Sequence, residues 1–151
     1  MKVVLAGAFG NLGADILKCL AADGHEIVAA DLKEGKIEGT EGKYTFVAID
    51  ATNPETLKGL CEGADVVITT MGLTGASTRF TSYDIDYKGN MNLYEECVRA
   101  GLAMTGEPRG FARVTAGFSS YDGEFRLPLV LAQASPIFHS SCEGKLGIAL
   151  E

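Results

Sequence analysis

Four apolar runs are spaced along the first half of the chain. The first, Val3 to Ala6, shows no alternation with polar residues, as expected for a parallel strand that is buried on both faces. Similar runs predict further strands at Glu26–Ala30, Tyr44–Ile49 and Val66–Thr70. Strands that alternate with helical segments predict a parallel sheet with right-handed crossovers and helices on both faces. The expected fold class is α/β, with a doubly wound parallel sheet of four to five strands.

Amphipathic stretches between these runs predict the helices. Asn11 to Ala22 carries its apolar residues on one stripe at 3.6-residue spacing. Asn53 opens a second helix, with a proline in its first turn, that is expected to run to about Cys61. A longer helix is expected from about Tyr83 to Ala100. Its apolar stripe consists of Tyr87, Met91, Tyr94 and Val98. This stripe is expected in the core or at a subunit contact, and the second alternative predicts a homodimer through residues 83–100.

Three glycines at G-x-x-G-x-x-G spacing separate the first strand from the first helix. Gly7 would permit the tight turn, Gly10 would let the backbone approach a ligand, and Gly13 would let the helix pack closely on the strand. The free amides and positive dipole end of the helix suit a pyrophosphate. Asp31 follows the second strand, where a carboxylate can accept hydrogen bonds from an adenosine ribose. The pattern indicates a dinucleotide site of the Rossmann type; the alternative is a structural glycine turn in a generic α/β domain.

Charges near Asp31 bear on the choice between NAD and NADP. A carboxylate at this position would repel a 2′-phosphate, and no arginine lies in the glycine loop or directly after Asp31. Lys33 and Lys36 weaken this argument, but NAD is favoured over NADP. Asp50 ends the third strand, where it either meets the adenine amino group or merely begins a turn.

Composition excludes several classes of function. The chain has 151 residues, 46% of them hydrophobic, and a net charge of −7 without a basic cluster, which argues against a nucleic-acid partner. No apolar run approaches the length that spans a membrane, and the first strand is too short for a signal-peptide core, so a cytoplasmic location without a membrane partner is expected. The cysteines are Cys19, Cys61, Cys97 and Cys142. Their wide spacing predicts neither a metal site nor a disulfide framework, and Cys19 and Cys97 are expected to be buried.

The first hundred residues resemble a known family. The stretches that carry the resemblance are Gly7–Gly13, Asp31, Asp50, Val66–Gly72 and Asp86–Leu93. They are similar to the N-terminal half of an extended or atypical short-chain dehydrogenase/reductase, the group that includes NAD-dependent sugar-nucleotide epimerases and dehydratases and the NmrA-like proteins. The resemblance implies a dinucleotide held by its pyrophosphate at the glycine turn, by its ribose at Asp31 and by its adenine near Asp50. The residues implied are Gly7, Phe9, Gly10, Asn11, Leu12, Gly13, Asp31, Leu32, Asp50, Ala51, Thr70, Met71 and Gly72.

Beyond residue 101 the chain departs from this family. The family's active site uses a Tyr-x-x-x-Lys pair, but Tyr121 is followed four residues later by Phe125, and the only lysine of this region is Lys145. A strand at Phe111–Phe118 would carry polar residues on one face and is expected at an edge of the sheet. We divide the chain into a dinucleotide-binding domain, 1–101, and an atypical tail, 102–151. We hypothesise that the tail replaces the family's catalytic half, in one version through an altered reading frame.

Three functions follow from these observations. The first is an NAD-dependent oxidoreductase or epimerase, with a small molecule or sugar nucleotide as its substrate. The second is a module that binds a dinucleotide without turning it over. The third is a non-catalytic fragment whose fourth strand is left as an open edge. From the sequence we assign no catalytic residue and no metal ligand.

Overall fold

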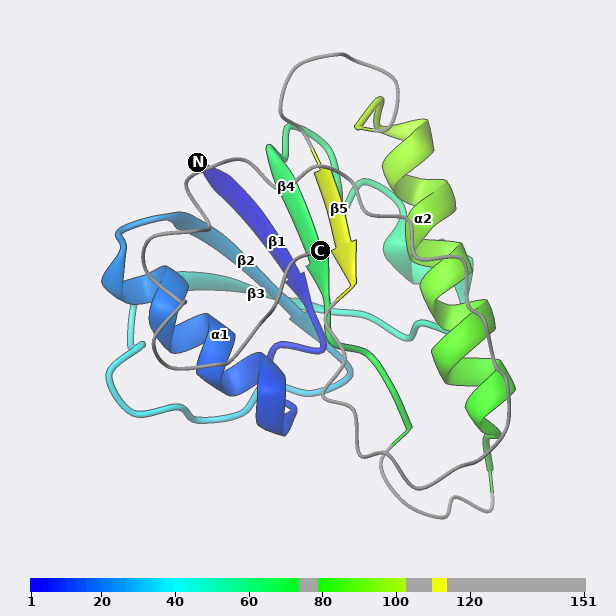
Figure 1. Ribbon diagram of the computed structural model, residues 1–151, viewed down its shortest axis with the longest axis horizontal. Coiled ribbons are helices and arrows are strands. Elements are labelled where there is room, and N and C mark those ends of the chain that lie inside the picture. Colours follow the sequence, from blue (N-terminus) through cyan, green and yellow to red (C-terminus); the bar gives the residue numbers. More distant parts are fainter. Residues whose placement is uncertain (74–78, 103–109, 114–151) are drawn as a thin grey trace, which may run out of the picture.

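The computed structural model describes residues 1–73, 79–102 and 110–113 of the chain. Five strands and two longer helices follow one another along it (Figure 1). The elements are β1 (Lys2–Ala6), α1 (Asn11–Ala22), β2 (Glu26–Asp31), β3 (Tyr44–Ala48), the 3-10 helix η1 (Pro54–Leu57), β4 (Val66–Thr69), the π-helix η2 (Tyr83–Gly89), α2 (Asn90–Arg99) and β5 (Gly110–Arg113). The segments 74–78, 103–109 and 114–151, which hold most of the proposed tail, lie outside the described residues.

All strand pairings are parallel, and the sheet has the order β3-β2-β1-β4-β5. Val4 in the central strand lies opposite Val28 on one side and Val67 on the other. The order runs outward from β1 in both directions, which is the arrangement of a doubly wound sheet. The predicted α/β Rossmann-type fold is therefore confirmed.

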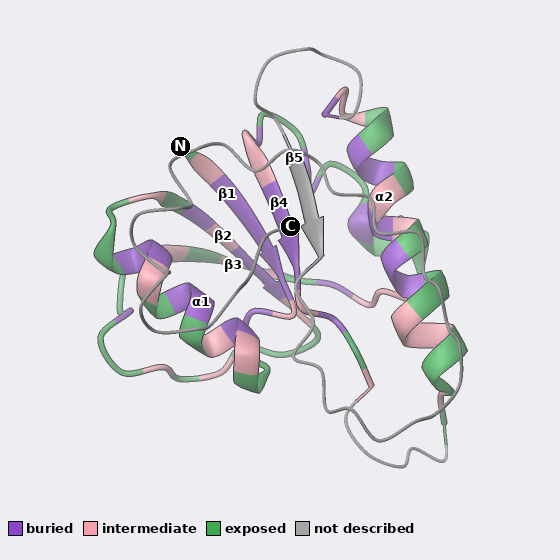
Figure 2. Ribbon diagram, viewed as in Figure 1, coloured by how far each residue is buried: buried purple, intermediate pink, exposed green. Residues whose placement is uncertain are grey.

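The sheet separates two apolar cores because successive side chains of a strand point to opposite faces. On one face, Val3 and Leu5 pack with Ile16 and Leu17 of α1. On the other, Val4 and Ala6 belong to a cluster that also contains residues of η1 and α2. Figure 2 shows the buried residues concentrated in the central strands and on the inner sides of the helices. The non-alternating apolar runs of the sequence therefore correspond to strands covered on both faces, as predicted.

The helix expected from Asn53 to Cys61 is wrong in its length. Asn53 does act as the cap, since its side chain accepts a hydrogen bond from the Glu55 amide at 3.2 Å, but the 3-10 helix ends at Leu57. Lys58 has already left the helical conformation, with a ψ of 125°, and Gly59 adopts a φ of +81° that a continuing helix excludes. A glycine between two helix-forming residues was the sequence feature that indicated this ending.

The expectation that the stripe of Tyr87, Met91 and Val98 lies in the core is also wrong. These side chains are 40%, 37% and 40% exposed. The buried side of the helix instead carries Leu93 and Cys97, with the polar residues Asn90 and Glu96. The helix has two stripes at helical spacing that could face the core. The stripe with Asn90 and Glu96 faces inward, because hydrogen bonds satisfy these polar side chains where they are buried. A subunit contact through the exposed stripe stays a prediction.

The described part of the sheet also corrects the open-edge hypothesis. β4 is not an edge, because β5 pairs with it in parallel register from Val66 opposite Gly110 to Thr69 opposite Arg113. β5 itself is the last strand of the described order, where the sequence places an edge strand. Gly101 has a φ of +80° just after the Ala100 cap of α2, a conformation in which a glycine commonly ends a helix.

Candidate functional site

The carboxyl ends of four adjacent strands meet at one edge of the sheet, where the sequence places the predicted site residues. Backbone hydrogen bonds join the segments that leave these ends. The Gly7 amide donates to the Ala30 carbonyl at 2.8 Å, and the Thr70 amide donates to the Ala6 carbonyl at 2.8 Å. In doubly wound sheets ligands bind at such an edge, where the strand order reverses on either side of the first strand. The fold therefore brings together the segments that start at Gly7, Asp31, Asp50 and Thr70.

The three glycines of the turn differ in what the fold itself requires. Gly7 has a φ of +80°, and a Cβ there would lie 2.8 Å from Thr70 Oγ1. A Cβ on Gly13 would overlap with the Gly7 carbonyl oxygen, because α1 crosses closely over the turn. At Gly10 a Cβ would meet only that same oxygen, at 3.4 Å, and φ is −71°. Packing explains Gly7 and Gly13, whereas the open space at Gly10 fits the close approach of a ligand.

Within the described residues, no side chain caps the start of α1. Gly10 occupies the cap position, makes no side-chain cap hydrogen bond, and no acidic residue stands in the first turn. The first intrahelical bond runs from the Ala14 amide to the Gly10 carbonyl at 2.8 Å. The amides of Asn11, Leu12 and Gly13 therefore point out of the helix end. Together with the positive end of the helix dipole, they form a site that favours an anion.

Asp31 lies directly beside this turn. Its Oδ2 accepts a hydrogen bond from the Phe9 amide at 2.9 Å, and its Oδ1 accepts one from the Leu32 amide at 2.7 Å. A carboxylate offers about four acceptor positions, so the group keeps capacity for ribose hydroxyls. The Phe9 ring packs edge-on against Tyr44 and Phe46, so that only its backbone belongs to the site. Leu32 is 61% exposed at the same edge.

At the end of β3 the carboxylate of Asp50 builds a turn. Oδ1 accepts hydrogen bonds from the amide and the hydroxyl of Thr52 at 2.9 and 2.7 Å. These bonds hold the pKa of Asp50 below its ordinary value, helped by the charge of Arg79. The turn alternative is thus present in the structure, while a contact with adenine stays a prediction. The carbonyl of Ala51 accepts a hydrogen bond from Asn92 Nδ2 at 2.8 Å, which ties this loop to α2.

The segment after β4 contacts the glycine turn through Thr70. The Thr70 hydroxyl donates to the carbonyls of Gly7 and Ala6 at 2.9 and 3.2 Å. Met71 is buried and Gly72 is exposed, and a Cβ on Gly72 would lie 3.0 Å from Asp86 Oδ1. The Thr70 contacts place this residue next to the turn, while contacts of Thr70, Met71 and Gly72 with a dinucleotide stay a prediction.

Asn90 is a residue of this region that sequence reasoning missed. Its Oδ1 accepts a hydrogen bond from the Thr69 hydroxyl at 2.7 Å, and its Nδ2 donates to the carbonyls of Asp86 at 3.0 Å and Met71 at 3.3 Å. The side chain is 8% exposed. Asn90 thereby fixes the end of β4 against the junction of η2 and α2. In the sequence, Asn90 lies within Asp86–Leu93, one of the stretches that carry the family resemblance, but its polar side chain gave no sign of being buried.

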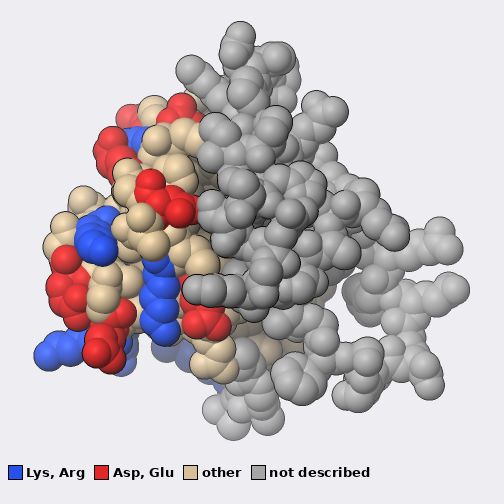
Figure 3. Space-filling model, turned by 60° about the vertical axis from the view of Figure 1, so that its left-hand side comes forward, with Lys and Arg blue, Asp and Glu red and all other residues tan. Residues whose placement is uncertain are grey.

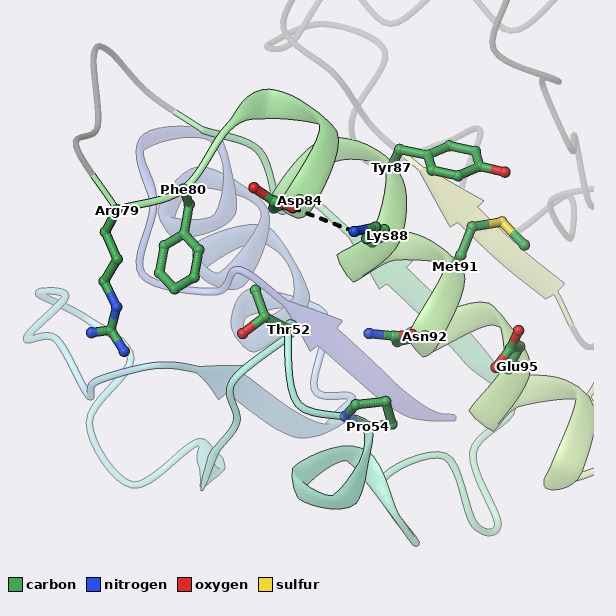
Figure 4. Close-up of a pocket in the computed structure, with 10 residues that line it drawn as sticks. All are labelled: Thr52, Pro54, Arg79, Phe80, Asp84, Tyr87, Lys88, Met91, Asn92 and Glu95. Atoms are coloured by element: carbon green, nitrogen blue, oxygen red, sulfur yellow. Dashed lines mark ion pairs between the residues drawn. The ribbon is translucent and has the colours of Figure 1, made fainter.

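A groove opens beside the Asp50 turn, between the loop after β3 and the two helical segments η2 and α2 (Figure 4). It is lined by Thr52, Pro54, Arg79, Phe80, Asp84, Tyr87, Lys88, Met91, Asn92 and Glu95. Its charges are mixed, with Lys88 Nζ 3.6 Å from an Asp84 carboxylate oxygen and the Arg79 guanidinium 5.0 Å from the centre of the Phe80 ring. None of the predicted cofactor residues lines this groove. It is a hollow separate from the glycine turn.

Comparison with known proteins identifies the family of this chain. The profile of the NAD(P)H-binding family matches residues 7–104, nearly two thirds of the chain, and includes the segments that start at Gly7, Asp31, Asp50 and Thr70. The chain belongs to the NAD(P)H-binding family. The predicted dinucleotide-binding class is confirmed, and the ligand class of the family is a nicotinamide dinucleotide. The fold is shared with NAD-complexed dehydrogenases and epimerases, as the resemblance implied.

Individual relatives place this NAD(P)H-binding segment within longer proteins. Uncharacterized protein 052L of Frog virus 3 is 32% identical over 111 residues, which are 69% of this chain and 31% of that protein. A variant of uronate dehydrogenase from Agrobacterium tumefaciens complexed with NAD superposes with a TM-score of 0.59 and 20% identity, over 74% of this chain and 39% of that one. UDP-glucose 4-epimerase from Thermus thermophilus, complexed with NAD, gives a TM-score of 0.56 and 23% identity, over 67% and 35%. The chain spans about a third of the length of the curated relative.

Two general features complete the description of the NAD(P)H-binding domain. Within residues 1–73, 79–102 and 110–113, no helix has the length and apolar character needed to cross a bilayer, and no three metal-ligating side chains converge. On the part of the face that Figure 3 shows in colour, acidic and basic side chains are interspersed. Cys97 is buried as predicted, whereas Cys19 is only partly buried.

Proposed function

We propose that this chain binds NAD at the carboxyl edge of its sheet, with the pyrophosphate over Gly10 and the adenosine ribose on Asp31. The observation that carries the proposal is the uncapped start of α1 beside a carboxylate that keeps free acceptor positions. An anion would satisfy the three outward amides, and the adjoining sugar would then lie within reach of Asp31. The adenine is expected near Leu32, Asp50 and Ala51, and the middle of the dinucleotide along Thr70, Met71 and Gly72.

The preference for NAD over NADP rests on the same carboxylate. A 2′-phosphate would meet the negative charge of Asp31, whose two oxygens are held in place by the amides of Phe9 and Leu32. Lys33, two residues after Asp31, is exposed and would offset part of the repulsion. We therefore expect tighter binding of NAD, with NADP still measurable.

We propose that the whole protein is an NAD-dependent oxidoreductase or a relative of the sugar-nucleotide epimerases and dehydratases. The bound dinucleotide would supply hydride transfer at its nicotinamide ring, and the chain's own residues would bind and orient it. The alternative is a module that holds the dinucleotide without turnover. One observation favours this alternative for the residues given: no tyrosine in the sequence is followed four positions later by a lysine. We assign no particular substrate.

Three expectations accompany the proposal and await their own measurements. The boundary between the NAD-binding domain and the tail is placed at residue 101. A homodimer is expected through the exposed stripe of η2 and α2, and a cytoplasmic location is expected from the sequence. Sedimentation of the purified chain would separate a dimer from a monomer.

The experiment for cofactor choice is calorimetric titration of the chain with NAD and with NADP. Asp31→Asn keeps an acceptor for the Phe9 amide but removes the charge, so we expect NAD to bind about tenfold more weakly and the gap between NAD and NADP to narrow. Asp23→Asn, at the opposite end of α1, is the matched control and should bind both as the parent chain does. Equal affinities of the Asp31→Asn variant and the parent chain for both dinucleotides would contradict the proposal.

A further inference from the structure

Two cysteines that lie 36 residues apart in the sequence meet beneath α2. The Sγ atoms of Cys61 and Cys97 are 3.3 Å apart, and both thiols are free. Cys61 lies in the turn after η1, and Cys97 lies on the inner side of α2. They are 0% and 1% exposed, in the core cluster that covers this face of the sheet. Neither residue belongs to the dinucleotide site.

Hydrogen bonds on both sides of this pair hold it together. The Gly59 amide donates to Glu96 Oε1 at 2.8 Å, just before Cys61 and Cys97 in their respective segments. Arg99 Nη2 donates to Glu62 Oε1 at 3.0 Å, just after them. The turn and the helix are thus linked at neighbouring positions, so that the two sulfur atoms remain opposite each other. Such mutual positioning is what a disulfide requires of two thiols.

We propose that Cys61 and Cys97 are an oxidation site that closes to an intramolecular disulfide on reaction with a peroxide. The sulfur atoms would have to approach from 3.3 Å to about 2.05 Å. Small rotations of two cysteine side chains supply a movement of that size. The proposal does not depend on dinucleotide binding, because the pair and its neighbours lie on a different part of the fold.

The reaction balances in two steps. One thiolate attacks a peroxide oxygen, the O–O bond breaks, and after proton transfer a sulfenic acid and one water are formed when the oxidant is hydrogen peroxide. The second thiol then attacks the sulfenic sulfur, the S–O bond breaks, and hydroxide leaves as a second water with the proton of that thiol. Two thiols lose two electrons in total, and one peroxide is reduced to two waters.

The two thiols are suited to different steps. The pKa of the Cys97 thiol is raised by its hydrogen bond to Cys61, by burial and by the nearby charges. Cys97 is therefore a poor first nucleophile. We assign the first step to Cys61. Its turn is flanked by Gly59 and Gly63, both with positive φ and both exposed, so that local opening of a short segment admits a small oxidant. Cys97 is then already in place for the second step.

The disulfide would close a loop that contains β4, the segment after it and η2, while Gly10 and Asp31 lie outside. Restricting this loop in the unfolded chain stabilises the folded one. We therefore expect the oxidised chain to melt at a temperature about 5 to 10 °C higher than the reduced chain. Binding of NAD should change less than threefold, because neither Cys61 nor Cys97 is among the residues expected to contact the dinucleotide.

The test treats the full chain with hydrogen peroxide, blocks remaining thiols by alkylation, and maps the peptides without reduction by mass spectrometry. The expected product is a pair of peptides linked through Cys61 and Cys97, lighter by two hydrogen atoms than the sum of the two reduced peptides. A reductant should separate the pair and restore this mass. Cys19→Ala is the control and should form the same product, while Cys97→Ala should form none. Sulfinic acid at Cys61 without the linked peptide, or a link through Cys19 or Cys142 instead, would overturn the proposal. The parent chain alone decides between these outcomes, whether or not the variants fold.

Discussion

The two helical segments that flank the sheet begin in opposite ways. α1 begins at Gly10 without a side-chain cap and without an acidic residue in its first turn. At the start of η2, which leads into α2, the Thr81 amide donates to Asp84 Oδ2 at 2.9 Å and the Asp84 amide donates to Thr81 Oγ1 at 3.3 Å. The second helix start pairs the Asp84 amide with a side chain of its own segment, whereas the first has no such side chain. An unsatisfied helix end at the carboxyl edge of a parallel sheet suits an anionic ligand, which is what we propose for α1.

The same contrast holds inside the domain. The core under α1 is apolar, whereas α2 buries Asn90 and Glu96 with their hydrogen-bond partners. The polar groups under α2 bind other parts of the chain, and the polar groups at the start of α1 face outward. Substitutions on the α2 side should therefore change stability, and substitutions at the exposed part of the glycine turn should change binding.

The largest expected effect is that of Gly13→Ala. The added Cβ would overlap with the Gly7 carbonyl oxygen, and backbone atoms on both sides leave little room for adjustment. We expect a loss of about 3 kcal/mol or more in the free energy of unfolding, measured by denaturant titration. A loss below about 1 kcal/mol would mean that α1 does not pack on the turn as described.

Asn90→Ala should come next. It would leave the Thr69 hydroxyl and the Met71 and Asp86 carbonyls without their present partners in a buried region. The expected loss of unfolding free energy is about 2 to 3 kcal/mol. Asn92→Ala is the matched control on the same helix, because it removes one partly buried hydrogen bond to Ala51 and should cost about 1 kcal/mol. Similar losses for both variants would remove the special position of Asn90.

Gly10→Ala separates binding from folding. The structure accommodates a Cβ there, so the free energy of unfolding should stay within about 0.5 kcal/mol of the parent value. NAD affinity should fall at least about tenfold, or about 1.4 kcal/mol, because the methyl group would stand where the pyrophosphate approaches the backbone. Calorimetry and denaturation on the same preparation would measure both quantities. Unchanged affinity would sink the assignment of Gly10 to the ligand.

Glu96 makes the α2 side sensitive to pH. Hydrogen bonds from Arg99, followed by that from the Gly59 amide, lower the pKa of this carboxyl group against the opposing effect of burial. A carboxyl with a lowered pKa in the folded state adds stability above its unfolded pKa, and that stability is lost as the pH falls through the folded value. Glu96→Gln should therefore cost about 1 to 2 kcal/mol at pH 7 and progressively less below about pH 4. A cost independent of pH would show that the charge contributes nothing.

Thr81→Ala should have the smallest effect. It removes the hydroxyl that accepts from the Asp84 amide and donates to its carboxylate at 2.7 Å. Loss of a helix cap costs about 0.5 to 1 kcal/mol, and NAD affinity should not change. A clear change in affinity would mean that this helix start, or the groove beside it, takes part in the binding of NAD.

The sequence predicted the first half of the fold closely because its features are local. Apolar runs indicated the strands, and α1 spans the predicted residues, Asn11 to Ala22. The glycine turn and Asp31 were found because their spacing along the chain reflects one continuous βαβ unit. A contact such as that of the Phe9 amide with Asp31 follows directly from this geometry.

What the sequence did not reveal depends on contacts between distant segments. The orientation of α2 was predicted from apolar periodicity, but Asn90 and Glu96 face inward because partners at Thr69 and Gly59 receive them. The meeting of Cys61 with Cys97 likewise follows from how the turn after η1 packs on α2, which no spacing rule encodes. Polar residues on a buried helix face were the signal that apolar counting passed over.

Binding of NAD by the start of α1 and Asp31 is tested by titrating the isotope-labelled chain with NAD and following the amide chemical shifts in NMR spectra. We expect the largest shifts on the amides of Gly10 to Gly13, with a second group at Asp31 and Leu32. The amides of Thr81 and Asp84, at the satisfied helix start, should move little. Largest shifts around the groove between Thr52 and Lys88, with unmoved amides at the start of α1, would contradict it.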